Sequence, residues 1–181
     1  MRILLLAPRA DGLPWAEAEV QAIDRTPGLT VTLRIGTVNH ADVLSDVIAG
    51  RYDGLWFAGH ATADGLLLTD GVLQNEEIVP LIRGRFQWVF LNTCESQATA
   101  RMIWRETGTA VVATILEVPD RLAFQTGALF AQALAETKDV AAAYAQSRPG
   151  GSRVYVYEAG TVKKKCRTMK PSSATWSGYS A

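Results

Sequence analysis

Two residue types suited to nucleophilic chemistry are scarce in this chain of 181 residues, which holds two histidines and two cysteines. One of each directly follows a short apolar run: GLWFAG precedes His60, and WVFLNT precedes Cys94. A thiol beside an imidazole is the minimum for acyl transfer. The imidazole takes the thiol proton, the thiolate attacks a carbonyl carbon, and the imidazolium protonates the leaving amine. The first hypothesis is therefore a Cys–His pair.

Both apolar runs are expected to be buried strands, over residues 54–58 and 88–91. In open α/β sheets ligands bind at the carboxyl ends of the strands, and neighbouring strands lie about 4.8 Å apart, so side chains from two strand ends can meet. Cys94 also precedes an expected helix over residues 98–106, whose amino-terminal dipole favours a thiolate. Backbone N–H groups of Cys94 and of residues 59–61 are candidates for stabilising an oxyanion.

A structural interpretation of the same residues stays open. Cysteine is among the residue types most often buried for packing alone, and His60 could be a core histidine bonded to the backbone. His40 lies in a helix-capping segment and is expected at the surface. Cys166 lies in a polar segment and is expected to be inert.

The elements that must position these residues follow from hydrophobic periodicity. Apolar runs alternate with amphipathic stretches, which predicts an α/β fold of three layers, with a mostly parallel sheet of about six strands and helices on both faces. The expected strands are residues 2–8, 29–35, 54–58, 88–91, 110–114 and 153–157, and the expected helices are 15–24, 41–49, 75–82, 98–106, 120–136 and 140–146. A hairpin is expected over residues 66–73, around Asp70-Gly71. The fully apolar third, fourth and fifth strands should be central, and the alternating strand 29–35 should lie near an edge.

Composition excludes several classes of protein. Hydrophobic residues make up 48% and charged residues 20%, which argues against global disorder. The formal net charge is zero, which argues against a nucleic-acid-coating protein. No apolar run approaches the roughly 20 residues of a membrane helix, and there is no signal-peptide pattern. Two cysteines are too few for a disulfide scaffold, so a cytoplasmic location is expected. Phosphate-binding glycine loops, zinc spacings and a GxSxG elbow are absent from the sequence.

The domain is expected to span residues 1–160. Residues 161–181 are basic and then rich in serine and threonine, without an apolar period, and are predicted to form a separate tail.

Three stretches in this order resemble the CHAT domain: DGLWFAGHATADGLLLTDGVLQNEEI, WVFLNTCES and GTAVVATILEVPD. CHAT domains are caspase-like cysteine peptidases, distantly related to caspases, metacaspases and separase. The similarity covers roughly residues 1–157 and is strongest over 52–135. The resemblance implies a caspase-like fold that hydrolyses peptide bonds through a Cys–His dyad, without metal or cofactor.

The resemblance also assigns individual residues. His60 occupies the F-x-G-H motif of the family's catalytic histidine, and Cys94 occupies the C-E-[ST] motif of its nucleophile. The oxyanion donors would be the backbone N–H groups of Ala61 and Cys94. Ala61 stands where relatives often have glycine.

Substrate contacts are less well defined. Relatives specific for Lys or Arg carry an aspartate two residues before the cysteine, where this chain has the neutral Asn92. Residues 115–120 would pair with an extended substrate by β-addition. Glu117 would face either the substrate pocket or the solvent, and Asp120 is expected to be a helix N-cap.

The resulting hypothesis is a cysteine endopeptidase acting on protein or peptide substrates. By analogy it would be an effector in bacterial defence or regulated cell death, working alone or with a regulatory partner protein. Two alternatives are a catalytically silent caspase-like adaptor that acts through a partner protein, and an amidohydrolase for small amides. Neither membrane nor nucleic acid is an expected partner.

Overall fold

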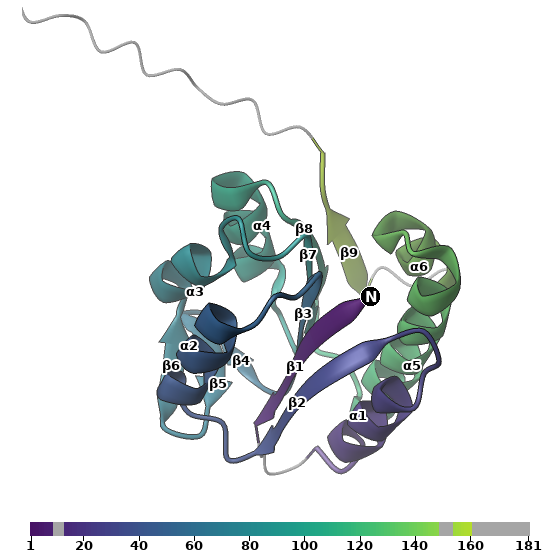
Figure 1. The fold of residues 1–181 in the computed structure, drawn as a ribbon, viewed down its shortest axis with the longest axis horizontal. Helices are drawn as coiled ribbons and strands as arrows, with labels where there is room; N and C mark the ends of the chain where they lie inside the picture. Colours follow the sequence, from purple (N-terminus) through teal and green to yellow (C-terminus); the bar gives the residue numbers. More distant parts are fainter. Residues whose placement is uncertain (9–12, 149–153, 161–181) are drawn as a thin grey trace, which may run out of the picture.

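A six-stranded sheet forms the centre of the structure, a computed structural model that describes residues 1–8, 13–148 and 154–160 (Figure 1). Five strands are parallel, and the last strand pairs antiparallel with its neighbour. From one edge to the other they are β2 (Thr30–Gly36), β1 (Arg2–Pro8), β3 (Gly54–Ala58), β7 (Trp88–Asn92), β8 (Ala110–Thr114) and β9 (Tyr155–Glu158). The expected three-layer, mostly parallel α/β fold is confirmed, including the edge position of the strand with alternating residues.

Side chains that alternate along each strand supply two separate cores. In β1, Leu4 and Leu6 belong to one core, while Ile3 and Leu5 belong to the other. Every residue of β3 and β7 is buried. A parallel sheet needs cover on both faces, and its central strands are therefore continuous apolar runs.

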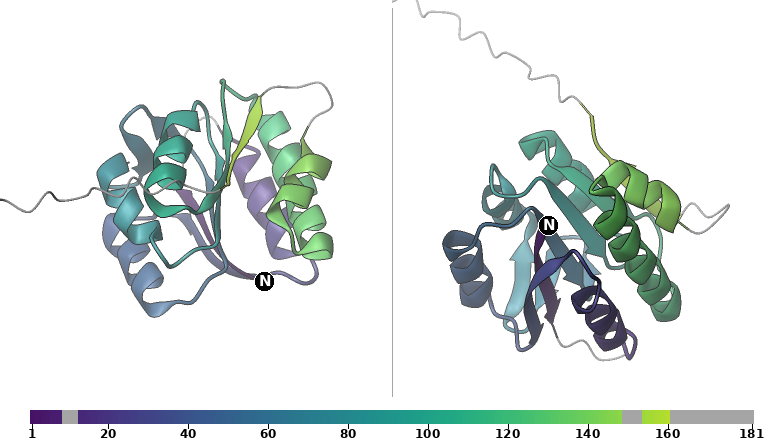
Figure 2. Two further views of the ribbon diagram at one scale, coloured as in Figure 1. Left: turned by 90° about the horizontal axis from the view of Figure 1, so that it is seen from above. Right: turned by 45° about the vertical axis from the view of Figure 1, so that its right-hand side comes forward.

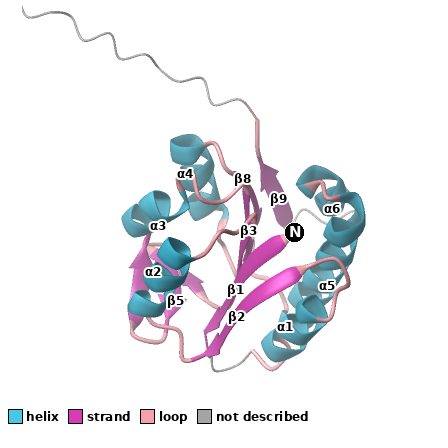
Figure 3. Cartoon of the chain, viewed as in Figure 1, coloured by secondary structure: helices cyan, strands magenta, loops and turns pink. Residues whose placement is uncertain are grey.

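Three helices cover each face of the sheet (Figures 1 and 2). On one face lie α2 (His40–Ala49), α3 (Asn75–Ile82) and α4 (Gln97–Thr107). On the other lie α1 (Ala16–Asp24), α5 (Asp120–Thr137) and α6 (Val140–Ser147). Figure 3 shows the resulting helix–sheet–helix arrangement. No helix within residues 1–8, 13–148 and 154–160 is long and apolar enough to cross a membrane.

A small antiparallel sheet follows β3 and holds the chain beyond it. It consists of β4 (Ala61–Thr62), β5 (Gly65–Leu68) and β6 (Gly71–Gln74). The predicted hairpin is confirmed as β5 and β6, whereas β4 is too short to show a period in the sequence. Leu66, Leu68 and Leu73 are buried in the core shared with α2 and α3, which anchors the hairpin beside the main sheet.

The start of α3 differs from the expectation that Asn75 caps it. Gln74 is the N-cap, and its backbone N–H donates to Oε2 of Glu77 at 2.8 Å. Asn75 is instead the first helical residue. Its amide donates to the carbonyl oxygen of Ala63 at 3.0 Å and accepts from the hydroxyl of Thr99 at 2.9 Å. The side chain thereby joins the turn between β4 and β5 to α4. Cys166 and the predicted tail lie outside the described residues.

Gly54 should be required for the packing of β3 against β7. It pairs with Trp88, and a Cβ at position 54 would lie 2.0 Å from Cε2 of that indole. Gly54→Ala is therefore expected to lower the free energy of unfolding by about 1–3 kcal/mol, as overpacking does, when measured by urea titration. Trp88→Phe in the same chain should recover part of this loss, because the smaller ring leaves room. Strictly additive effects of the two substitutions would contradict the explanation.

Candidate active site

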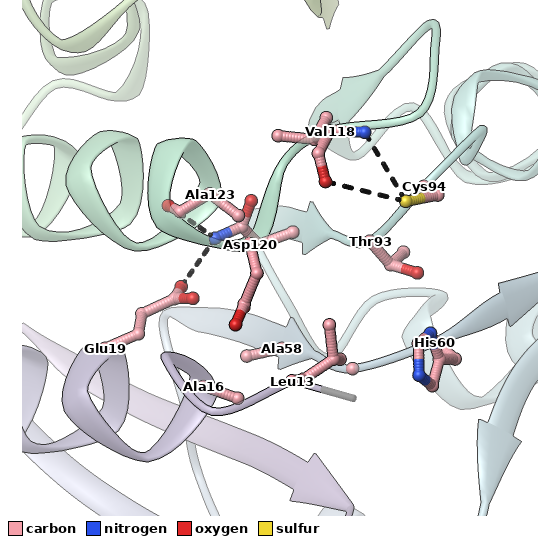
Figure 4. A pocket seen from close by; sticks show the side chains of 12 residues that line it. Leu13, Ala16, Glu19, Ala58, His60, Thr93, Cys94, Val118, Asp120 and Ala123 are labelled. Atoms are coloured by element: carbon pink, nitrogen blue, oxygen red, sulfur yellow. Dashed lines mark hydrogen bonds between the residues drawn. The ribbon is translucent and has the colours of Figure 1, made fainter. Parts of the chain in front are cut away.

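A pocket opens at the carboxyl ends of β3 and β7, between α1 and the beginning of α5 (Figure 4). Its empty volume is about 370 Å³, counting the open mouth. His60 and Cys94 both line it. The fold therefore brings the two residues singled out in the sequence to one solvent-accessible hollow.

The register of β3 and β7 explains why His60 and Cys94 line the same pocket. Ala58, the last residue of β3, pairs with Asn92, the last residue of β7. His60 and Cys94 each follow two residues after this pair, so the two side chains leave the sheet at the same level. In Figure 4 both lie on the same side of the pocket, Cys94 above and His60 below.

The sulfur of Cys94 is held by the backbone of Val118. The Val118 N–H donates to Sγ at 3.5 Å, and the thiol lies 3.9 Å from the Val118 carbonyl oxygen. Figure 4 shows Sγ turned toward this residue. One residue thus offers the thiol both a hydrogen-bond donor and an acceptor.

The turn that carries Cys94 has a special backbone conformation. Glu95 has a φ of 50°, in the left-handed region that residues other than glycine rarely adopt. Cys94 is separated from α4 by Glu95 and by the N-cap Ser96, so it lies close to the helix start without belonging to its first turn.

Buried hydroxyl groups hold this turn, and sequence analysis missed them. The Ser96 hydroxyl donates to the carbonyl oxygens of Leu91 at 3.3 Å and Thr93 at 3.2 Å. It also accepts the backbone N–H of Thr114 at 3.1 Å, and the Thr114 hydroxyl donates to the Thr93 carbonyl. The signal in the sequence was a group of small hydroxyl residues at the end of one apolar strand, β8, and directly after another, β7.

The backbone N–H of Ala61, a candidate oxyanion donor, lies in the short strand β4. Ala61 is opposite Leu66, and the Leu67 N–H donates to the His60 carbonyl oxygen at 3.0 Å. This pattern makes Ala61 and Leu66 a non-hydrogen-bonded pair, in which the N–H groups point away from the partner strand. The Ala61 N–H is therefore left out of the small sheet.

Asn92 lines the pocket but is bound on both ends of its amide. Nδ2 donates to Oε1 of Glu19 at 2.7 Å and to the Ala123 carbonyl oxygen at 3.0 Å. Oδ1 accepts the hydroxyl of Tyr155 at 2.6 Å. Asn92 thus links β7 to α1, α5 and β9, and both hydrogen atoms of its amide are already used.

Glu19 is the main residue of the pocket that sequence analysis missed. Its side chain is 3% exposed and accepts a second hydrogen bond from the Trp56 indole at 2.9 Å. Burial raises the pKa of Glu19 to about 8, against the opposing effect of its bonds from Asn92 and Trp56, and the nearby charge of Asp120 raises it further. The sequence held one signal: Glu19 occupies the apolar face of its helix, three residues after Ala16 and four before Ile23.

Helix α5 leaves space for this carboxyl group at Gly127. A Cβ there would lie 2.5 Å from Oε1 of Glu19. The glycine therefore allows α1 and α5 to approach around a buried glutamate.

The two acidic candidates at the start of α5 differ in position. Pro119, not Asp120, is the N-cap of α5, so the expected capping role of Asp120 is wrong. Asp120 instead lines the pocket and accepts the backbone N–H of Trp15 at 2.8 Å. Glu117 is exposed. Within the described part of the chain, no group of three or more His, Cys, Asp or Glu residues is placed to hold a metal ion.

His40 does not approach the pocket described here. It lies at the start of α2, where its Nδ1 is 2.8 Å from the Asp70 carboxylate and its Nε2 is 3.2 Å from the Val72 carbonyl oxygen. Hydrogen bonds to Asp70 and Val72 raise the pKa of His40, against the opposing effect of partial burial. This histidine links α2 to the hairpin.

Glu19→Gln should remove a loss of stability that the wild type shows as pH rises from about 4.5 to about 8. The pKa of this carboxyl group is about 8 in the folded chain and 4.5 ordinarily, so between these values only the folded state keeps the proton. Stability of the wild type should therefore fall as pH rises through this window, by at most ~1.4 kcal/mol per pH unit. Urea unfolding at several pH values checks this, with Glu17→Gln as the control because Glu17 is exposed on the same helix. Parallel profiles for wild type and Glu19→Gln would contradict the assignment.

Comparison with known proteins agrees with the resemblance noted in the sequence. Residues 7–179 match the CHAT domain, a range that includes most of the predicted tail. No curated protein matches the chain. Because the match spans nearly the whole sequence and the fold is consistent with that of caspases, the chain belongs to the CHAT domain family, a caspase-like family.

Proposed function

We propose that this protein is a cysteine peptidase, with Cys94 as the nucleophile and His60 as the general base and acid. The observation that carries the proposal is the shared pocket. Two side chains from distant parts of the sequence leave adjacent strand ends at one level and line the same hollow. Membership of a family that includes caspase-like cysteine peptidases supports the same assignment.

The reaction would follow the usual course of acyl transfer. His60 takes the proton of the Cys94 thiol, and the sulfur attacks the carbonyl carbon of the scissile peptide bond. The carbonyl oxygen becomes an oxyanion, bonded by the N–H groups of Ala61 and Cys94. When the intermediate collapses, the C–N bond breaks and the imidazolium protonates the leaving amine. Water, deprotonated by His60, then hydrolyses the thioester and restores the thiol.

The resting contacts of Cys94 fit this course. Val118 holds the sulfur at the pocket wall, and the strained Glu95 and the hydroxyl network fix the turn around it. A nucleophile held in place before the substrate arrives loses less conformational entropy on reaction. The biological role that we propose by analogy is an effector in bacterial defence or regulated cell death, with a protein substrate and a regulatory partner protein.

Selective labelling of one thiol tests the proposal. In a Cys166→Ser chain, iodoacetamide should alkylate Cys94 faster in the folded protein than in urea, and His60→Ala should slow the folded reaction, because the imidazole no longer takes the proton. His40→Ala should leave the rate unchanged, since His40 is bonded elsewhere. Intact-protein mass spectrometry follows the label.

Hydrolysis of peptide bonds is tested with the same variants. A proteome is incubated with each variant in turn, and mass spectrometry detects the new peptide termini. Cys94→Ala should abolish new peptide termini, and His60→Ala should reduce their rate of formation about 10²- to 10⁴-fold, the usual contribution of general acid–base catalysis. If Cys94 reacts no faster folded than unfolded, and the wild type cleaves nothing that Cys94→Ala does not, the peptidase proposal fails. If the Cys94→Ala variant still captures a partner protein, that result would then favour the alternative of a catalytically silent adaptor.

A further inference from the structure

The outer edge of β2 carries backbone groups that the main sheet does not use. β2 is the last strand on its side, and no strand within the described residues pairs with its far edge. The Thr30 N–H donates to the carbonyl oxygen of Met1 at 2.8 Å, so Thr30 is bonded toward β1. Because successive residues of a strand direct their N–H and C=O groups to opposite edges, Val31, Leu33 and Ile35 direct theirs outward. Figure 1 shows β2 with α2 on one side of it and α1 on the other.

This edge lacks the usual protection against a further strand. Proteins commonly guard a free edge with lysine, proline, a bulge or a very short strand. β2 has seven residues, contains no lysine or proline, and keeps an uninterrupted register with β1. Its one charged residue is Arg34, whose guanidinium donates to the Asp46 carboxylate of α2 at 2.6 and 2.8 Å. The charge that could repel another strand is therefore paired with α2.

The order of side chains along β2 shows which strand fits the edge. Val31, Leu33 and Ile35 alternate with polar residues, so they share one face of the strand, and Leu33 is their centre. If two copies pair antiparallel about this centre, Leu33 faces itself and Val31 faces Ile35 of the second copy. Each of these pairs joins two outward residues, which exchange both of their backbone hydrogen bonds. Every opposed side chain on this face is then apolar, and such cross-strand pairs stabilise a sheet.

The other face of β2 fits the same register. Arg34 would lie opposite Thr32 of the second copy, so no charge of the strand faces a like charge. Thr30 would lie opposite Gly36. The Ile35 side chain, which is 46% exposed, would be covered by the second copy. The strand is thus complementary to itself in hydrogen bonding, apolar pairing and charge.

We propose that β2 is a homodimer interface, in which the β2 strands of two copies pair antiparallel about a twofold axis at Leu33. The main sheet then continues from one copy into the other, and both copies use the same surface, as a twofold interface requires. A single pair of strands is a small interface, so the dissociation constant should be on the order of 10–100 µM. The inference is independent of the peptidase function, because the pocket lies at the ends of β3 and β7.

Sedimentation equilibrium of the full chain measures the association, under reducing conditions that exclude disulfides between copies. The weight-average mass should rise from 19.6 kDa toward twice that value as the concentration increases from about 5 to about 300 µM. Ile35→Lys should raise the Kd about tenfold or more, because both symmetric pairs with Val31 lose an apolar contact. Leu129→Lys is the control and should leave the Kd unchanged, since Leu129 is 51% exposed on α5, outside this edge.

A second substitution tests the register. Val31→Glu in the Ile35→Lys chain places a carboxylate opposite the ammonium of the second copy, and should lower the Kd again about threefold. Val31→Lys in the same chain places two ammonium groups opposite each other and should raise the Kd further. Positions 31 and 35 of one copy are about 13 Å apart along the strand, too far to pair with each other. Thermal melts establish that each variant is folded.

Amide hydrogen exchange of the wild type, read by NMR, locates the interface without any substitution. The amides of Val31, Leu33 and Ile35 should exchange about threefold more slowly at about 500 µM than at about 20 µM, because only the monomer exposes them. The amides of Thr32 and Arg34 are the internal control. They point toward β1 in both states, so their exchange should not depend on concentration. This measurement decides the matter if Ile35→Lys does not fold.

Several outcomes would overturn the proposal while the peptidase function stands. One is a chain that remains monomeric at every concentration, which leaves the edge open to an extended segment of another protein. A dimer that Ile35→Lys leaves intact is another, because its contact then lies elsewhere. Edge amides that are equally protected at every concentration would mean that the same chain covers the edge. If Val31→Glu and Val31→Lys weaken the Ile35→Lys dimer equally, the register centred on Leu33 is wrong.

Discussion

The parallel pairing of β3 with β7 is the constraint on which the site depends. Both strands are buried along their whole length, so each is fixed in register by the helices on its two faces. A slip of one residue would move Trp56 and Phe57 to the wrong cores. The same register that satisfies the cores places the residues after Ala58 and Asn92 level with each other. Core packing and the position of the candidate dyad are therefore set by one set of contacts.

A second constraint is the buried polar cluster of Glu19, Trp56, Asn92 and Tyr155, which joins three strands and two helices below the pocket. Burial raises the pKa of Tyr155 well above its ordinary value, and the charge of Glu19 adds to this effect. Burial thus disfavours the ionised forms of Glu19 and Tyr155. The hydrogen bonds from Trp56 and Asn92 offset part of the cost of burying the Glu19 carboxyl group.

The order of elements was predictable because each element has a clear period or apolar run. The strands at residues 2–8, 54–58 and 110–114 and the helix that ends near residue 137 were correctly placed to within a residue or so. The caps at Asn75 and Asp120 were wrong by one residue, because side chains that usually cap a helix were used in tertiary hydrogen bonds. The two-residue strand β4 was missed, because so short a strand exists only through its pairing with β5.

The sequence by itself determined the fold class and the two residues proposed to react, since histidine and cysteine are rare here and each follows an apolar strand in a motif typical of the family. The tertiary structure alone decided what surrounds them. No local pattern predicts the contact of Cys94 with Val118, because the two residues are 24 positions apart. The same holds for the pocket, which brings together Glu19, Asn92 and Asp120 from distant parts of the sequence. Such contacts depend on how helices pack across strand ends, and local periodicity carries no information about that.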